Sequence, residues 1–174
     1  MGARFLISSQ TLTSTAATVT FSSIPATYTD LVLRYSARAD NASAVNNLRL
    51  QFNSDTATNY SETYMRGNGA TAASGRTSSA VELVEGLVID GDSATASTFS
   101  NNEIYIPSYT VSQNKPISMA AVQEDNSTTG RFYASAGLWR NTAAITSIYI
   151  YLSGGSGNIK TGSSFYLYGI SKTN

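Results

Sequence analysis

Three pairs of carboxylates are the residues of this sequence whose spacing could support acid–base chemistry. A glycosidase needs two carboxyl groups that converge on one bond and differ in pKa. In a strand, residues three positions apart point to opposite faces, so the first pair is not expected to converge. The third pair falls in a predicted hairpin tip open to water, where burial cannot tune a pKa. The pairs are Glu82 with Glu85, Asp90 with Asp92, and Glu124 with Asp125.

The residue types that usually carry catalysis are missing. The sequence contains no His and no Cys. This excludes a Ser-His-Asp triad, thiolate chemistry and disulfides, and it removes the commonest ligand of transition metals. No lysine follows a serine in Ser-x-x-Lys spacing within a helical pattern. The sequence therefore predicts a protein that is not an enzyme and that holds no cofactor.

Two short segments cluster oxygen atoms of the kind that Ca²⁺ prefers. They are residues 90–93, Asp-Gly-Asp-Ser, and residues 53–56, Asn-Ser-Asp-Thr. Neither matches the twelve-residue calcium loop, which ends in a bidentate Glu. Turns in which Asp or Asn bonds its own backbone explain both segments better. We predict no metal ligands, and the sequence alone leaves a bound calcium ion open.

Charge is scarce and balanced. Charged residues are 13% of the chain, with 11 basic and 11 acidic residues and a formal net charge of zero. Nucleic-acid binding needs a basic surface, and membrane-surface binding needs a basic amphipathic helix; neither is present in the sequence. Residues 1–7 have no signal-peptide pattern, and no apolar run approaches the roughly 20 residues of a membrane span. We expect synthesis in a cytoplasm and no nucleic-acid or membrane partner.

Alternation of apolar and polar residues is the dominant pattern. Leu31, Leu33 and Tyr35, for example, alternate with more polar neighbours, as in strands with one buried face. No helix with a proper start, stop and apolar stripe is visible. The pattern predicts one all-β domain over residues 1–174, a sandwich of about 8–10 antiparallel strands. The candidate strands are residues 5–7, 17–21, 31–36, 48–53, 81–89, 103–109, 116–123, 131–139, 146–152 and 165–171.

Two long polar stretches, residues 53–79 and 91–102, interrupt these strands and are predicted to be loops. Loops of this length in a compact domain are usually functional or packed against something, although freely varying surface loops are an equal alternative. In the first stretch, Asp55, Tyr60 and Tyr64 are candidate contact residues for a partner.

Tyrosines give the sequence a second kind of surface. The chain has 11 Tyr against 6 Phe and 1 Trp. Tyr149 and Tyr151 share one face of a predicted strand, and Tyr166 and Tyr168 share one face of another. Because tyrosine joins an apolar ring to a polar tip, such a face suits a subunit interface or a stacking platform for sugars. Burial of both faces inside the sandwich is the plainer alternative.

The sequence also resembles virion proteins of tailed phages, namely capsid decoration proteins and tail-fibre heads, including those of cyanobacterial and marine phages. The most specific part runs Ile24-Pro25-x-x-Tyr28-x-x-Leu31-x-Leu33-Arg34. Further similar segments are residues 6–12, 19–28, 31–38, 48–55, 59–61 and 166–170. The resemblance implies a jelly-roll fold and assembly as a trimer.

The short region before the first strand favours a decoration or cement protein on the capsid exterior, which would contact itself and the major capsid protein. A tail-fibre head that recognises a host glycan or receptor is the alternative, and a cellular carbohydrate-binding module is a third. Arg34 and Arg38 are candidates for contacts with carboxylates of another subunit. Ordinary solvated arginines are the competing interpretation.

Overall fold

The computed structural model describes residues 2–127, 130–152 and 157–171, and within them it contains twelve strands and no helix. Eight strands form a long sheet in the order β1 (Ala3–Thr11), β12 (Ser164–Ser171), β3 (Asp30–Ser36), β8 (Asn101–Ile106), β9 (Lys115–Gln123), β10 (Arg131–Trp139), β5 (Tyr60–Gly67) and β6 (Ala72–Ala80). Four form a short sheet in the order β2 (Thr18–Phe21), β11 (Ile148–Leu152), β4 (Val45–Phe52) and β7 (Val88–Asp90).

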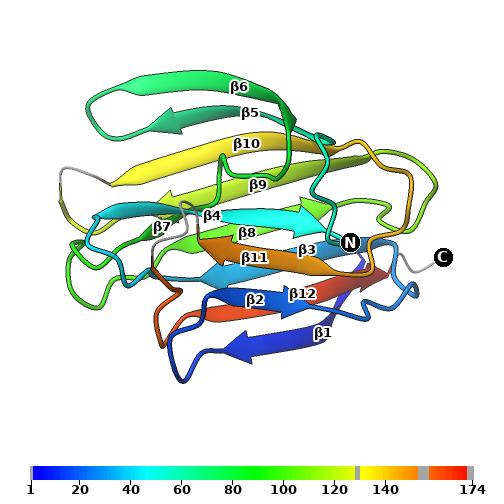
Figure 1. Cartoon of the computed structure of the whole chain (residues 1–174), viewed down its shortest axis with the longest axis horizontal. Helices are drawn as coiled ribbons and strands as arrows, with labels where there is room; N and C mark the ends of the chain where they lie inside the picture. The colour runs from blue at the N-terminus through cyan, green and yellow to red at the C-terminus, as the bar shows by residue number, and fades with distance from the viewer. Residues whose placement is uncertain (1, 128–129, 153–156, 172–174) are drawn as a thin grey trace.

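The two sheets stack face to face, and every pairing within them is antiparallel. This confirms the predicted all-β sandwich. Figure 1 shows the short sheet in front of the middle and lower strands of the long sheet, while the β5–β6 hairpin extends beyond it at the top. No helix in the described ranges is long and apolar enough to cross a membrane.

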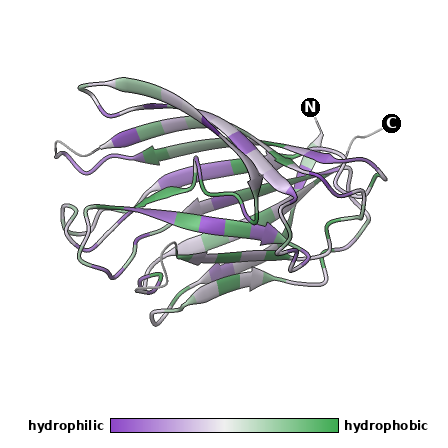
Figure 2. Ribbon diagram, turned by 45° about the horizontal axis from the view of Figure 1, so that its top comes forward, coloured by the Kyte–Doolittle hydropathy of each residue, from purple (hydrophilic) through white to green (hydrophobic). Residues whose placement is uncertain are grey.

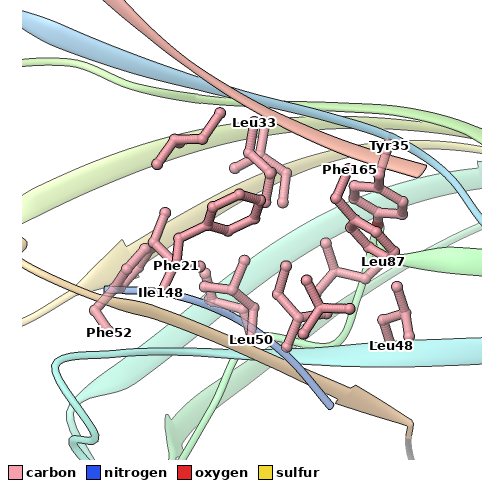
Figure 3. Packing of buried hydrophobic residues seen from close by; sticks show 14 of the residues in the cluster. Phe21, Leu33, Tyr35, Leu48, Leu50, Phe52, Leu87, Ile148 and Phe165 are labelled. Atoms are coloured by element: carbon pink, nitrogen blue, oxygen red, sulfur yellow. The ribbon is translucent and has the colours of Figure 1, made fainter. Parts of the chain in front are cut away.

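The core lies between the sheets, where the alternation of the strands places their apolar side chains. β9 is the clearest case, since its nine residues are alternately buried and exposed along the whole strand. Figure 3 shows Leu33 and Phe165 of the long sheet facing Phe21, Leu50 and Ile148 of the short sheet. All five are at most 3% exposed. Figure 2 shows the matching bands of hydrophobic and hydrophilic residues along the strands.

The predicted strand number is too low, because the stretch of residues 53–79 is not a loop. It contains β5 and most of β6, which form a hairpin at one edge of the long sheet. The sequence of β6 is Ala-Ala-Ser-Gly-Arg-Thr-Ser-Ser-Ala, and neither of its faces is buried. A strand without a buried face needs no apolar alternation, so the sequence of β6 carries no pattern that predicts a strand.

The strand predicted over residues 81–89 is also wrong. Only its last part becomes β7, and Leu83 forms a single bridge to Leu50. Gly86 between them has a φ of 89°, a left-handed conformation that breaks the strand and that favours glycine. The stretch from Gly91 to Ser100 does lack strands, as predicted.

Candidate functional site

The face of the long sheet that points away from the short sheet is the candidate site, and we call it the outer face. Strand register places its side chains in rows across all eight strands; one row runs through Arg34, Glu103, Ala120, Ala134 and Met65. The outer face includes Leu6, Ser9, Arg34, Thr63, Met65, Ser74, Arg76, Glu103, Tyr105, Ser118, Ala120, Val122, Phe132, Ala134, Ala136, Tyr166 and Tyr168.

One end of the outer face is aromatic and charged. Tyr166 and Tyr168 lie on β12 with ring centroids 6.5 Å apart and planes at 22°. Beside them, Arg34 Nε lies 3.0 Å from Glu103 Oε2, and Arg4 approaches the same oxygen at 3.8 Å. Because these groups are half exposed, the ion pairs add little stability. A hollow of about 270 Å³ lies against Arg34 and the two tyrosines.

The other end of the outer face is apolar. Met65, Phe132 and Val122 are 65%, 53% and 40% exposed, which is unusual for side chains of this size. A hollow of about 420 Å³ lies between Met65, Phe132 and the small residues of the β5–β6 hairpin. Between the two ends, the outer face carries the small side chains of Ser118, Ala120, Ala134 and Ala136. The outer face is therefore a shallow surface with large side chains at both ends and small ones in the middle.

Arg38 is not on this face, and its predicted contact with another subunit is wrong. Its side chain is 4% exposed and lies inside its own chain. The guanidinium donates hydrogen bonds to the backbone carbonyls of Thr95, Thr98 and Ala94 at 2.8, 2.9 and 2.9 Å. Since β3 ends at Ser36, the alternation that places Arg34 outward no longer applies two residues later. Arg38 fixes the shape of the loop before β8.

Tyr149 and Tyr151 lie on β11 of the short sheet, whereas Tyr166 and Tyr168 lie on β12 of the long sheet. Their ring centroids are 5.1 Å apart. The Tyr151 hydroxyl donates a hydrogen bond to the carboxylate of Glu82, which also pairs with Arg49. Burial raises the pKa of Tyr151. The segment that follows β6 thus covers part of this tyrosine pair, and the pair is less accessible than Tyr166.

The three candidate contact residues of the first polar stretch have internal partners. Asp55 accepts hydrogen bonds from the indole N–H of Trp139 at 2.8 Å and from the Asn59 amide at 2.9 Å. Tyr60 is fully buried on β5, so its prediction as an exposed contact residue is wrong. Tyr64 also lies on β5, half-buried over Gly75, with its ring 5.9 Å from that of Tyr133. These side chains hold the hairpin to the sandwich.

Sequence reasoning missed Glu62, a buried carboxyl group whose pKa is strongly raised. It is 3% exposed, and its Oε2 accepts hydrogen bonds from the backbone N–H groups of Val84 and Glu85, both at 3.0 Å. Desolvation raises the pKa of Glu62 to about 7, against the opposing effect of these two hydrogen bonds. The only signal in the sequence was its place in an alternating run that was assigned to a loop.

The raised pKa of Glu62 predicts a pH-dependent stability. Its ordinary pKa is 4.5, so the folded protein holds this proton more tightly than the unfolded chain. The contribution is complete below about pH 4.5 and is lost as the pH rises through about 7. From pH 4.5 to 8, we expect the free energy of unfolding of the wild type to fall by up to about 3 kcal/mol because of Glu62. In Glu62→Gln, this fall should be absent. Urea melts over this range measure it, and Glu103→Gln, on the exposed outer face, should leave the fall unchanged.

The oxygen-rich segments do not gather into an acidic cluster. Asp90 accepts a hydrogen bond from Gln123 at 2.7 Å, Asp92 pairs with Lys160, and Asp55 is bound to Trp139. In the described ranges, no group of three acidic side chains lies close enough together to bind one metal ion. Glu82 and Glu85, the first carboxylate pair of the sequence, have different partners. Glu82 contacts Arg49, whereas the charge of Glu85 interacts with Arg66 and Arg131.

Comparisons with known proteins add little to this geometry. No family model and no curated protein matches the sequence. Among solved structures, the galectin LEC-6 of Caenorhabditis elegans is similar at 11% identity and a TM-score of 0.35, with 97% of this chain and 96% of that chain covered. A similarity this distant supports no argument about ligands.

Proposed function

We propose that this protein is a non-enzymatic structural component of a tailed-phage virion, with a jelly-roll fold, that trimerises on the capsid exterior and cements neighbouring shell subunits. The observation that supports the proposal is the outer face, an extended surface with exposed Met65, Phe132 and Val122 and few charges. Monomeric proteins rarely leave such a surface open to water.

The size of the outer face suits a stable interface. Eight strands at about 4.8 Å spacing and about 8 residues in length at about 3.4 Å each give a surface of roughly 1,000 Å². A standard interface buries about 800 Å² on each partner. The whole chain has a formal net charge of zero, so copies of it would not repel each other strongly. A trimer and a shell subunit could each cover part of it.

The first test places a charge in the middle of the outer face. Ala134 lies between the two ends, with small neighbours, and Ala134→Glu would bury an unpaired carboxylate in any complex that covers it. We expect the dissociation constant for self-association or shell binding to rise at least about 100-fold. Sedimentation equilibrium and co-sedimentation with empty shells measure both. The control is Ala17→Glu, an exposed position beside β2 on the other sheet.

The second candidate is a fibre head that binds host glycans, and the stacked and accessible pair Tyr166–Tyr168 favours it. Aromatic rings of this kind can pack on sugar rings. A glycan array and binding to host cells separate the two functions. Binding to glycans by a protein that ignores shells would replace the first proposal with the second. A monomer that binds neither would remove both.

A further inference from the structure

The two sheets have four edges, and one of them differs from the others. The edges are β1 and β6 of the long sheet, and β2 and β7 of the short sheet. β2 and β7 have only four and three residues. β1 is interrupted in its middle, because the register shifts between Leu6 and Ser8. Short edges and bulges are features that discourage pairing with a foreign strand.

β6 lacks these features over most of its length. Its register with β5 is regular from Ala72 to Thr77, and the irregularity falls after that, where Ser79 has a φ of 58°. This regular stretch contains no proline and one charged residue, Arg76. In the described part of the chain, β5 is the one strand that pairs with it. Every second residue of this edge therefore turns its N–H and C=O groups to solvent.

The surroundings of β6 are open and apolar. The hairpin extends past the short sheet, so no second layer obstructs its approach (Figure 1). On the outer face, Ser74 lies directly beside Met65, and Ala72 lies beside Gly67. These small residues leave the hollow of about 420 Å³ in which the Met65 and Phe132 side chains are exposed. The edge thus offers backbone hydrogen bonds and an apolar surface at the same place.

We propose that β6 is a pairing site for a second copy of this chain, in which two β6 strands align antiparallel about a two-fold axis and join two long sheets into one. The pairing of two β6 strands rests on the proposed self-association. It is a contact separate from a trimer interface on the outer face. A two-fold contact and a three-fold contact together would link copies into a net over a shell.

The sequence of β6 is compatible with pairing to itself. Residues directly opposite each other in an antiparallel pair point to the same face, so the axis can pass through Ser74 or through Gly75. Both registers place small side chains at the axis and keep the two Arg76 side chains from lying opposite each other. With the axis at Gly75, Arg76 of each copy lies opposite Ser74 of the other, where its aliphatic stem can cover Met65.

Sedimentation velocity over a concentration series tests the pairing. Ala73→Lys places a charge on the exposed edge, on the side of β6 that points away from the outer face, and charged side chains are a device by which natural edges avoid pairing. We expect the wild-type protein to show a two-fold association that Ala73→Lys weakens at least about 30-fold. The matched control is Thr18→Lys, an exposed position on β2 at an edge of the short sheet, and it should associate as the wild type does. Gly75 is unsuitable for this test, since an added Cβ would lie 2.6 Å from the Tyr64 hydroxyl.

Disulfide trapping gives the register. The chain has no cysteine, so any disulfide in these variants reports the introduced residues. Opposite Cβ atoms in an antiparallel pair are about 4.5–5.5 Å apart, within reach of a disulfide after small adjustments. Under air with copper phenanthroline, which oxidises two thiols to a disulfide, Ser74→Cys should cross-link if the axis passes through Ser74. The double variant with Ser74→Cys and Arg76→Cys should cross-link in either register.

The outcomes separate this inference from the proposed function. Association that is lost in Ala73→Lys and cross-linked through β6 supports edge pairing. Equal association of the wild type and Ala73→Lys, or the absence of any cross-link in the double variant, overturns it. Ala134→Glu tests the outer face independently, so a protein that trimerises through that face without edge pairing would retain its proposed function and lose this inference.

Discussion

Replacing Arg38 with methionine should lower the free energy of unfolding by about 3–5 kcal/mol, one of the largest effects expected of a single substitution in this chain. The methionine keeps most of the volume but removes every donor. The carbonyls of Ala94, Thr95 and Thr98 would then lose hydrogen bonds made at 2.8–2.9 Å. The Thr95 carbonyl keeps its hydrogen bonds from Thr98. A buried acceptor left without a partner costs about 1–3 kcal/mol, so the carbonyls of Ala94 and Thr98 account for most of the expected loss.

Arg34→Met is the matched control, because Arg34 lies four residues earlier and is exposed. Its ion pair with Glu103 is worth at most about 1 kcal/mol. Urea melts give both values, and hydrogen exchange locates the damage. In Arg38→Met, the backbone N–H groups of Ala94 and Thr98, which bond within the loop, should exchange faster. Equal stability of the two variants would contradict the role we assign to Arg38.

The contrast between the two arginines shows how far the sequence could predict the site. Alternation is reliable within a strand, so Arg34, Tyr166 and Tyr168 lie on a common face. Arg38 lies beyond the end of β3, where the chain turns and the rule no longer holds. The loop carbonyls that surround it come from residues more than 50 positions away. Nothing local in the sequence signals that contact.

The same reason explains why the fold was predicted in outline and the hairpin was missed. Buried strands such as β9 carry their own periodic signal. β6 is held by backbone pairing with β5 and by the contact of Tyr64 with Gly75, neither of which leaves a hydrophobic pattern. Without such a pattern, the sequence predicts a loop around Asp55 and Tyr60. An edge hairpin is visible only once its partner strand is placed.

Burial of charged side chains lowers the number of charges on the surface below the number that the composition suggests. Of the 11 basic and 11 acidic residues, seven are buried in the described ranges, among them Arg38, Glu62 and Lys115. The Lys115 ammonium, for example, donates to the carbonyl of Val111 at 2.9 Å. The surface therefore carries even fewer charges than the low overall content suggests. Weak surface charge is compatible with the proposed self-association, because copies of the chain would not repel each other strongly.

The second large effect is expected at Trp139, which is fully buried and is the largest side chain of the core. Its ring packs 5.4 Å from Phe52 and 6.4 Å from Tyr60, so it joins β10 and β5 to the short sheet. Trp139→Ala should lower the free energy of unfolding by about 3–5 kcal/mol, because it leaves a cavity that neighbouring strands cannot fill. Thermal and urea melts, with far-UV spectra to verify the fold, measure the loss.

Trp139→Phe separates packing from hydrogen bonding at the same position. The phenyl ring retains most of the apolar contact, so we expect a smaller loss, about 1–3 kcal/mol, from the missing indole N–H and a smaller cavity. Although desolvation opposes it, hydrogen bonding by Asn59 and Trp139 holds the pKa of Asp55 below its ordinary value. Without the indole N–H, the pKa of Asp55 should rise, and NMR titration of the Asp55 carboxyl detects the change. An unaltered Asp55 pKa in Trp139→Phe would mean that the hydrogen bond from Trp139 to Asp55 does not hold the loop of residues 53–59. A raised pKa would establish Asp55 as an internal anchor and remove it from any partner surface.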